Sequence, residues 1–155
     1  MADAGAQTTT KVAGTIREGH YILIDNRPCK VLDVVAASNG RPNWCSFVGR
    51  DIFTLNERVS ADFSLSDNVV VPIVNHNDYE VVHIDRTNVE VFYAAGEVKE
   101  FQVIDRTLLN RIRARLDDDR KLDRELSRRS LVATVLSAMG EERISAFKAI
   151  NPIYP

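Results

Sequence analysis

Residues 21–40 read YILIDNRPCKVLDVVAASNG, in which two apolar, β-branched runs are each followed by residues typical of turns. The run at 21–24 stops at DNRP, and the run at 30–35 stops at SNG. Residues 44–48 and 52–55 continue the pattern, with Gly49 and Asn56 between and after them. Short strands at this spacing, with no helical period between them, predict a small β-barrel.

The run VVVPIV at 69–74 indicates where this barrel ends, because Pro72 has no N–H to donate to a sheet in mid-strand. We place a domain boundary at 72–75, which gives one domain over 13–72 and a second over 73–155. Residues 1–12 are rich in Ala and Thr, and we expect them to form a flexible tail.

The second domain begins with three strand-like runs at 79–84, 89–93 and 98–103, which predict a meander. A helical period follows, with Leu108, Leu109, Ile112 and Leu116 on one face, so we expect a helix near 105–126. Either Asp105 or Thr107 is available as its N-cap.

The remaining elements of this domain are a strand and a second helix. Residues 131–137 are continuously apolar, as in a strand that is covered on both sides. Residues 141–150 are expected to be a short helix, with Glu141 and Glu142 at its positive end and Lys148 at its negative end. The order of strands and helices suits a five-stranded barrel of the OB type.

Composition describes an ordinary soluble surface. The 155 residues are 27% charged with a formal net charge of −2, without the basic excess of a duplex-DNA-binding protein. The sequence contains no signal peptide, no apolar run long enough to cross a membrane, and no peroxisomal tripeptide at Ile153-Tyr154-Pro155, so the expected location is the cytoplasm. In that compartment Cys29 and Cys45 are expected to be buried thiols.

Catalytic motifs are absent from the sequence: it has no phosphate-binding Gly-rich loop, no Gly-x-Ser-x-Gly elbow and no His-Glu-x-x-His. The best metal-binding candidate is His76-Asn77-Asp78, but adjacent loop residues without a second cluster are more typical of a solvated turn. We therefore expect no enzyme, cofactor, metal ion or small-molecule substrate.

The main concentration of basic residues lies between 106 and 129. Acidic residues are interleaved with them, which favours a salt-bridged solvent face over a phosphate-binding stripe. The residues that would contact phosphate or a partner under the second interpretation are Arg111, Arg113, Arg115, Arg128 and Arg129.

The most exposed feature predicted for the first domain is a loop tip at 39–44. Asn39 and Gly40 both tolerate the positive φ of a hairpin turn. Arg41 is pushed toward an extended backbone by Pro42. Trp44 either enters the barrel core with the next strand, which we favour, or forms an exposed stacking platform.

Four segments resemble the translation initiation factor 5A family. They are NRPCKV at 26–31, VGRDIFT at 48–54, GEVK at 96–99, and TVLSAM at 134–139 followed by Glu141-Glu142. They occur in the family's order and extend over residues 16–150. The resemblance implies an SH3-like barrel followed by an OB-fold barrel, with the ribosome and tRNA as partners in translation elongation.

The resemblance also gives the loop tip a role. In the family this loop carries, just after a glycine, a lysine that is modified to hypusine and reaches the peptidyl-tRNA end on the ribosome. Aligned through Gly40, that position is Arg41, which cannot be converted because building hypusine requires a neutral amine as nucleophile. The residues after it, PNWC at 42–45, also lack the family's basic and His-containing pattern, and the stretch from there up to Asp51 looks shorter than in the family.

A second relative shares these departures. The major protein of fungal Woronin bodies resembles factor 5A, lacks the modified lysine, has a shortened loop and assembles with copies of itself. Residues 103–111, VIDRTLLNR, resemble that protein more closely than factor 5A, although its peroxisomal ending is missing here. Two functions remain open: a ribosome-binding factor 5A-like protein that is not hypusinated, or a self-assembling structural paralogue.

Overall fold

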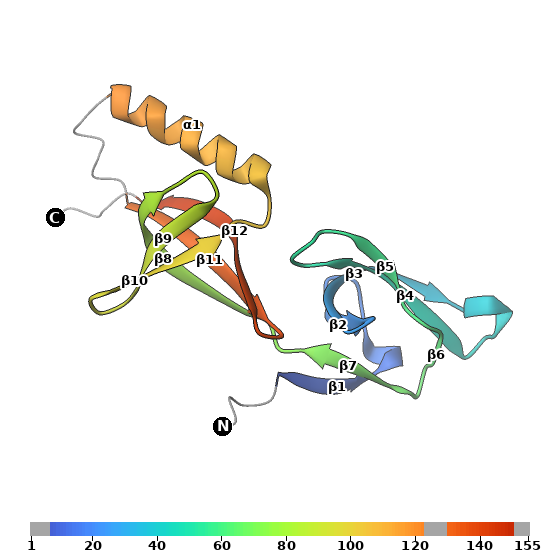
Figure 1. Ribbon diagram of the computed structural model, residues 1–155. Coiled ribbons are helices and arrows are strands. Elements are labelled where there is room, and N and C mark those ends of the chain that lie inside the picture. Colours follow the sequence, from blue (N-terminus) through green and yellow to red (C-terminus); the bar gives the residue numbers. More distant parts are fainter. Residues whose placement is uncertain (1–6, 123–129, 151–155) are drawn as a thin grey trace. The chain divides into compact units, whose positions relative to one another are not determined.

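The structure, a computed structural model, describes residues 7–122 and 130–150. It divides into two compact units. Unit 1 comprises Met1–Val74 and Ala138–Gly140, and unit 2 comprises Asn75–Ser137 and Glu141–Pro155. Strands dominate both units and the described residues contain one α-helix, which confirms the predicted mostly-β fold class (Figure 1).

Unit 1 is an SH3-like barrel of short antiparallel strands. Its main sheet has the order β2-β3-β4-β5, formed by Tyr21–Ile24, Arg27–Ala36, Trp44–Asp51 and Glu57–Val59, and β6 (Phe63–Ser64) also pairs with β4. The β2–β3 hairpin has a two-residue turn, since Ile24 pairs with Arg27 and both turn residues, Asp25 and Asn26, have positive φ.

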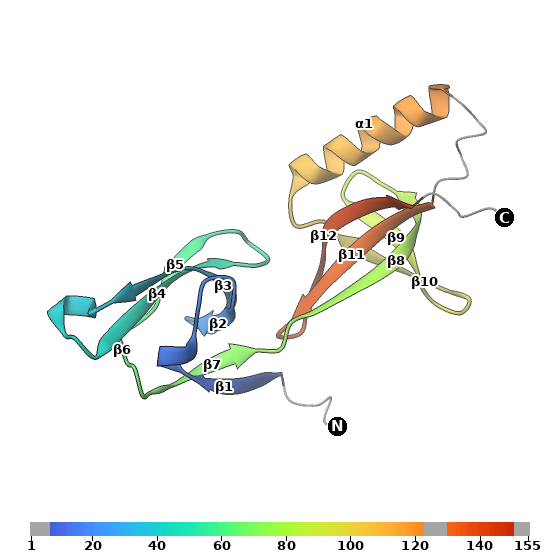
Figure 2. The same ribbon diagram turned by 180° about the vertical axis from the view of Figure 1, so that it is seen from behind.

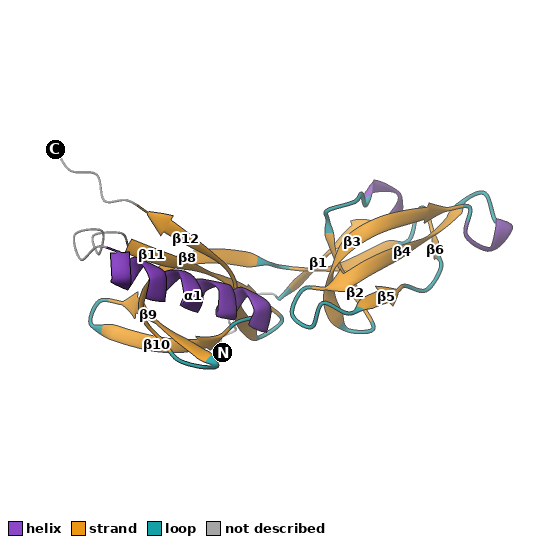
Figure 3. Cartoon of the chain, turned by 90° about the horizontal axis from the view of Figure 1, so that it is seen from above, coloured by secondary structure: helices purple, strands orange, loops and turns teal. Residues whose placement is uncertain are grey.

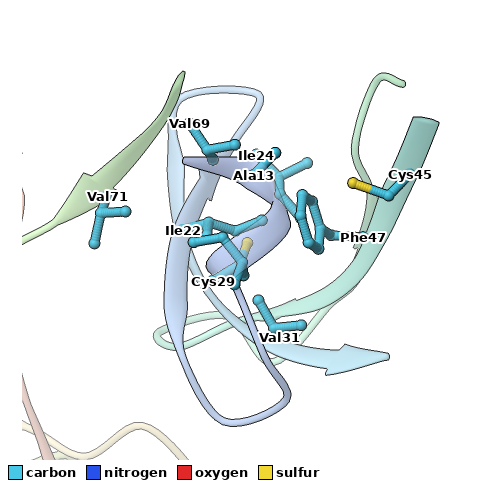
Figure 4. Packing of buried hydrophobic residues seen from close by; sticks show 10 residues of the cluster. Ala13, Ile22, Ile24, Cys29, Val31, Cys45, Phe47, Val69 and Val71 are labelled. Carbon is cyan, nitrogen blue, oxygen red and sulfur yellow. The ribbon is translucent and has the colours of Figure 1, made fainter. Parts of the chain in front are cut away.

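The core of unit 1 lies between these strands. Phe47, Ile22 and Val31 are at most 1% exposed and are joined by the buried thiols Cys29 and Cys45. Figure 4 shows Ile22, Cys29 and Phe47 among the buried side chains that β2, β3 and β4 contribute to this cluster. Half-buried and buried residues alternate along β2, and β3 carries both buried and exposed residues, so the sheet turns one face toward this core.

Two elements predicted for unit 1 were wrong. The expected flexible tail at 1–12 includes a strand, because β1 (Thr8–Val12) pairs with β7 (Asn68–Pro72), and its threonines are β-branched residues suited to a strand. The first six residues lie outside the described part. Residues 52–55 form a turn rather than a strand, since the Asp51 carboxylate accepts hydrogen bonds from the amides of Phe53 and Thr54 at 2.9 and 3.1 Å.

Unit 2 is an OB-fold barrel with the strand order β10-β9-β8-β11-β12. The strands are β8 (Asn75–Ile84), β9 (Asn88–Ala94), β10 (Glu97–Gln102), β11 (Ser130–Ala138) and β12 (Glu141–Ile150). A parallel bridge from Val103 to Ile144 links the chain just after β10 to β12, which closes the barrel. The helix α1 (Arg106–Leu122) connects its third and fourth strands, as the OB order requires (Figure 2).

The helix α1 was predicted from its apolar period and is confirmed over 106–122. Asp105 is the N-cap, because its Oδ1 accepts a hydrogen bond from the Thr107 amide at 2.9 Å. Leu109 is buried in the core of unit 2, and Ile112 packs against it. Residues 123–126 of the expected helix lie outside the described part.

The predicted helix at 141–150 was wrong, because these residues form the strand β12. Met139 and Gly140 have φ of 51° and 81°, and they turn the chain back so that β12 lies beside β11. Ile144 is fully buried in the core of unit 2 and Phe147 packs against that core. Tertiary pairing with a buried strand therefore overrides the helix-like charge pattern of 141–148.

Candidate functional site

The candidate site is the loop at residues 37–43, which joins β3 to β4 in unit 1 (Figure 3). Asn39 and Gly40 both have positive φ, 56° and 75°, as the sequence predicts for a hairpin connection. The loop is longer than a two-residue turn, since the last strand pair is Ala36 with Cys45. Within it, η2 (Ser38–Gly40) is closed by a hydrogen bond from the Arg41 amide to the Ser38 carbonyl at 3.2 Å.

Asp62, which lies between β5 and β6, contacts this loop through its carboxylate. Its carboxylate accepts hydrogen bonds from the Ser38 hydroxyl and the Asn39 side-chain amide. One Nη of Arg41 lies 3.5 Å from Oδ2 of the same carboxylate. Ser38 is buried and also lies 3.4 Å from the Ser46 hydroxyl on β4. The loop tip is therefore tied to the barrel by three side chains that meet at one carboxylate.

Arg41 also contacts Trp44. The guanidinium carbon lies 3.8 Å from the centre of the indole ring, which is the geometry of a cation–π contact. The Arg41 side chain is 48% exposed, and Pro42 beside it is exposed as well. Trp44 is half-buried and does not belong to the core cluster, so the favoured prediction that it enters the barrel core was wrong. The indole ring of Trp44 instead packs against the Arg41 guanidinium.

The far end of the β3–β4 hairpin is anchored by a buried ion pair. Asp51 is fully buried, and its carboxylate accepts hydrogen bonds from Arg27 Nε at 2.7 Å and Nη2 at 3.2 Å. Burial opposes ionisation of Asp51, but hydrogen bonds from Arg27 and from the amides of Phe53 and Thr54 outweigh it and lower its pKa to about 2. Asp51 therefore stays ionised at neutral pH.

The candidate arginines of the second domain lie in a different unit from this loop. Arg111 on α1 is exposed and Arg113 is half-buried. Arg115 is also on α1, but its side chain is outside the described part, as are Arg128 and Arg129. The structure thus brings Asn39, Arg41 and Trp44 together within unit 1, whereas Arg111 and Arg113 belong to unit 2.

Among the described residues, no group of three or more His, Cys, Asp or Glu side chains is arranged to hold a metal ion. No helix in the described ranges is long and apolar enough to span a bilayer.

Asp62 is the site residue that the sequence did not identify. It lies in the segment SADFS at 60–64, which matches no motif, and its role depends on a tertiary contact with residues 21 to 24 positions earlier in the chain. Nothing in the local sequence distinguishes it from the other surface carboxylates, so only the fold could reveal it.

Comparison with known proteins gives consistent similarities. Residues 6–61 match a family model described as translation initiation factor 5A-like, N-terminal. The chain is 39% identical to eukaryotic translation initiation factor 5A-1 of Arabidopsis thaliana, over 97% of this chain and 93% of that protein. It is 38% identical to eukaryotic translation initiation factor 5A-1 of Medicago sativa, over 97% of this chain and 91% of that protein.

Solved structures agree with the sequence relatives. A translation initiation factor 5A family protein from Naegleria fowleri matches with a TM-score of 0.71 and 26% identity, over 92% of this chain and 99% of that one. Eukaryotic translation initiation factor 5A from Methanococcus jannaschii matches with a TM-score of 0.67 and 19% identity, over 92% and 98% of the two chains, which shows a shared fold.

Proposed function

Because the chain belongs to the translation initiation factor 5A family, whose members are non-enzymatic translation factors, we propose that it binds the ribosome and acts in translation elongation with an unmodified arginine at its loop tip. The observation that carries the proposal is the 39% identity over 97% of the chain, which includes both barrel units. A cytoplasmic location, expected from the sequence, fits this role.

Arg41 takes the position of the family's modified lysine in this proposal. Hypusine formation begins with attack by a neutral lysine amine, whereas a guanidinium stays protonated at every physiological pH. The Arg41 side chain is half-exposed at the tip of a loop that Asp62 holds in place, so an RNA phosphate can reach its guanidinium. The chain would then contact RNA through a short, fixed cation in place of a long, modified one.

Co-sedimentation with ribosomes tests this function. The protein is expected to sediment with ribosomes at low salt and to be released as salt rises, because each phosphate contact releases a counterion. Arg41→Ala should lower the bound fraction and reduce its salt dependence. Arg50→Ala is the matched control, since Arg50 is an exposed cation on β4 of the same unit. Failure of the wild-type chain to sediment with ribosomes even at low salt would refute the proposal.

The alternative is self-assembly, as in a structural paralogue similar to the Woronin-body major protein. One observation favours it: Phe92 on β9 and Val98 on β10 are cross-strand partners and are 49% and 50% exposed. Such an exposed apolar pair is a candidate contact between copies. Light scattering over a concentration series tests self-assembly. A protein that stays monomeric at high concentration would exclude this function, whereas an oligomer that is lost in the Phe92→Glu variant would support it.

A further inference from the structure

The Asp62 carboxylate has two kinds of partner in the Arg41 loop. Its contacts with Ser38 and Asn39 are hydrogen bonds from neutral groups that fix the backbone of η2. Its contact with Arg41 is an ion pair at 3.5 Å, made by one Nη and one oxygen. The first kind shapes the loop, whereas the second compensates the only formal charge that the residues 37–44 carry.

This arrangement makes the loop tip close to neutral as a whole. The Arg41 side chain is 48% exposed and the Asp62 side chain is 23% exposed, so a ligand that approaches the guanidinium also meets the carboxylate. An anion near Arg41 is attracted by the guanidinium and repelled by the Asp62 carboxylate, whose Oδ2 lies 3.5 Å from the guanidinium. The net attraction for phosphate is therefore weaker than an isolated arginine would provide.

Building on the proposed function, we propose that Asp62 is an internal counter-ion that masks Arg41, and that an RNA phosphate binds this loop by taking the guanidinium from the Asp62 carboxylate. Asp62 is then a specificity-determining residue of the site. Asp62 favours ligands whose phosphate forms two hydrogen bonds with the Arg41 guanidinium in place of the carboxylate. It disfavours anions that approach Arg41 without forming such a pair.

The exchange is feasible because neither partner is left without contacts. The guanidinium has five N–H donors and pairs with phosphate through two parallel hydrogen bonds, which one oxygen at 3.5 Å does not provide. Asp62 keeps its hydrogen bonds from Ser38 and Asn39 when the arginine leaves. Trp44 continues to support the guanidinium from below during the exchange, since its contact is with the ring face.

A binding titration with single-stranded RNA tests the mask. The probe is a fluorescein-labelled oligoadenylate of eight nucleotides, and the proteins are wild type, Asp62→Asn, Arg41→Ala and the double variant. Asp62→Asn should bind RNA about two- to fivefold more tightly at low salt, from the strength typical of an exposed ion pair. Arg41→Ala should weaken RNA binding. The double variant should not show the tighter RNA binding expected of Asp62→Asn.

Two controls separate the mask from other effects. Asp33→Asn removes an exposed carboxylate from β3 of the same unit, so it makes the same change in net charge away from the loop and should alter affinity little. Asp62→Glu keeps the charge and should not show the gain. Emission from Trp44, which is the only tryptophan, reports whether the loop retains its structure in the Asp62 single variants, where Arg41 is still present beside the ring.

The outcomes are distinguishable. Unchanged or weaker RNA binding by Asp62→Asn, with Arg41→Ala still weakening it, would overturn the mask and leave the proposed function intact. RNA binding that is indifferent to Arg41→Ala would overturn both the mask and the use of Arg41 in the proposed function. If Asp62→Asn and Asp33→Asn increased RNA affinity equally, the masking of Arg41 by Asp62 would also be refuted, since the increase would then follow from the change in net charge alone.

Discussion

Replacing Asp51 with asparagine should destabilise unit 1 at neutral pH and have a much smaller effect in acid. The fully buried carboxylate accepts hydrogen bonds from Arg27 and from the amides of Phe53 and Thr54. Arg58 Nε lies 3.9 Å away and is buried without a hydrogen-bond partner, so it also depends on this charge. Asparagine fills the same volume but removes the charge and turns an N–H group toward the arginines.

The expected magnitude follows from the pKa of Asp51. Its value of about 2 in the folded protein lies below the ordinary value of 3.8, so folding favours the ionised form. A shift of this size corresponds to about 2 kcal/mol of stability. Breaking a buried ion pair costs about 3–5 kcal/mol, but Arg27 and Arg58 are 27% and 31% exposed and remain partly hydrated, so we expect about 2–3 kcal/mol at pH 7.

The sign of the pH dependence distinguishes charge from packing. A carboxyl whose folded pKa is lowered contributes stability that is present above pH 3.8 and is lost as the pH falls through about 2. Wild type therefore loses this contribution in acid, whereas Asp51→Asn has none to lose. The difference in free energy of unfolding between the two proteins should shrink as the pH is lowered from 7 to 2.5.

Urea denaturation followed by the fluorescence of Trp44 is the appropriate assay. Trp44 lies in the same unit as Asp51 and is the only tryptophan, so the signal reports unit 1 without a contribution from unit 2. Asp33→Asn serves as the control, because Asp33 is exposed on the same sheet. This substitution should change the free energy of unfolding little at any pH. A difference between wild type and Asp51→Asn that stays constant from pH 7 to pH 2.5 would refute the electrostatic argument.

The core of unit 1 gives three further predictions. Gly49→Ala should destabilise the protein by about 1–3 kcal/mol, because the added Cβ would lie 3.0 Å from the Cβ of Cys29; a urea midpoint equal to wild type would contradict the close packing. Phe47→Ala should cost about 3–5 kcal/mol in the same assay, since the ring is fully buried, and a cost below 1 kcal/mol would mean that the core collapses around it. Burial raises the pKa of the Cys29 thiol to about 11 and also raises that of Cys45, so neither should react with a disulfide reagent at pH 8 until the protein is denatured; rapid labelling of the native protein would exclude their burial.

Part of the fold could be predicted because its signals are local. The turn residues Asp25-Asn26 have the positive φ that type I′ hairpins need, and they appear in the structure where the sequence predicts a strand to stop. The helix α1 was also predictable, since Leu109 and Ile112 recur at helical spacing and Asp105 caps the first turn.

Other elements depend on residues that are distant in the sequence. The segment 141–150 has the charge distribution of a helix but is a strand, because pairing beside β11 buries Ile144 in the core. The threonines of β1 become a strand through pairing with β7, some 60 residues later in the chain. The local sequence pattern identifies neither of these partner strands, because strand pairing depends on which sheet edges are unpaired in the folded chain.

The candidate site shows the same division. The sequence alone determined that the loop tip carries Asn39-Gly40-Arg41. Through the resemblance it also predicts that Arg41 stands where the family modifies a lysine, and a guanidinium cannot replace that lysine chemically. Only the tertiary structure decided the environment of Arg41: it places Trp44 beneath the guanidinium and Asp62 beside it. The identity of a residue sets its own charge and chemistry. The neighbouring groups that strengthen or offset that charge come from distant segments that only folding brings together.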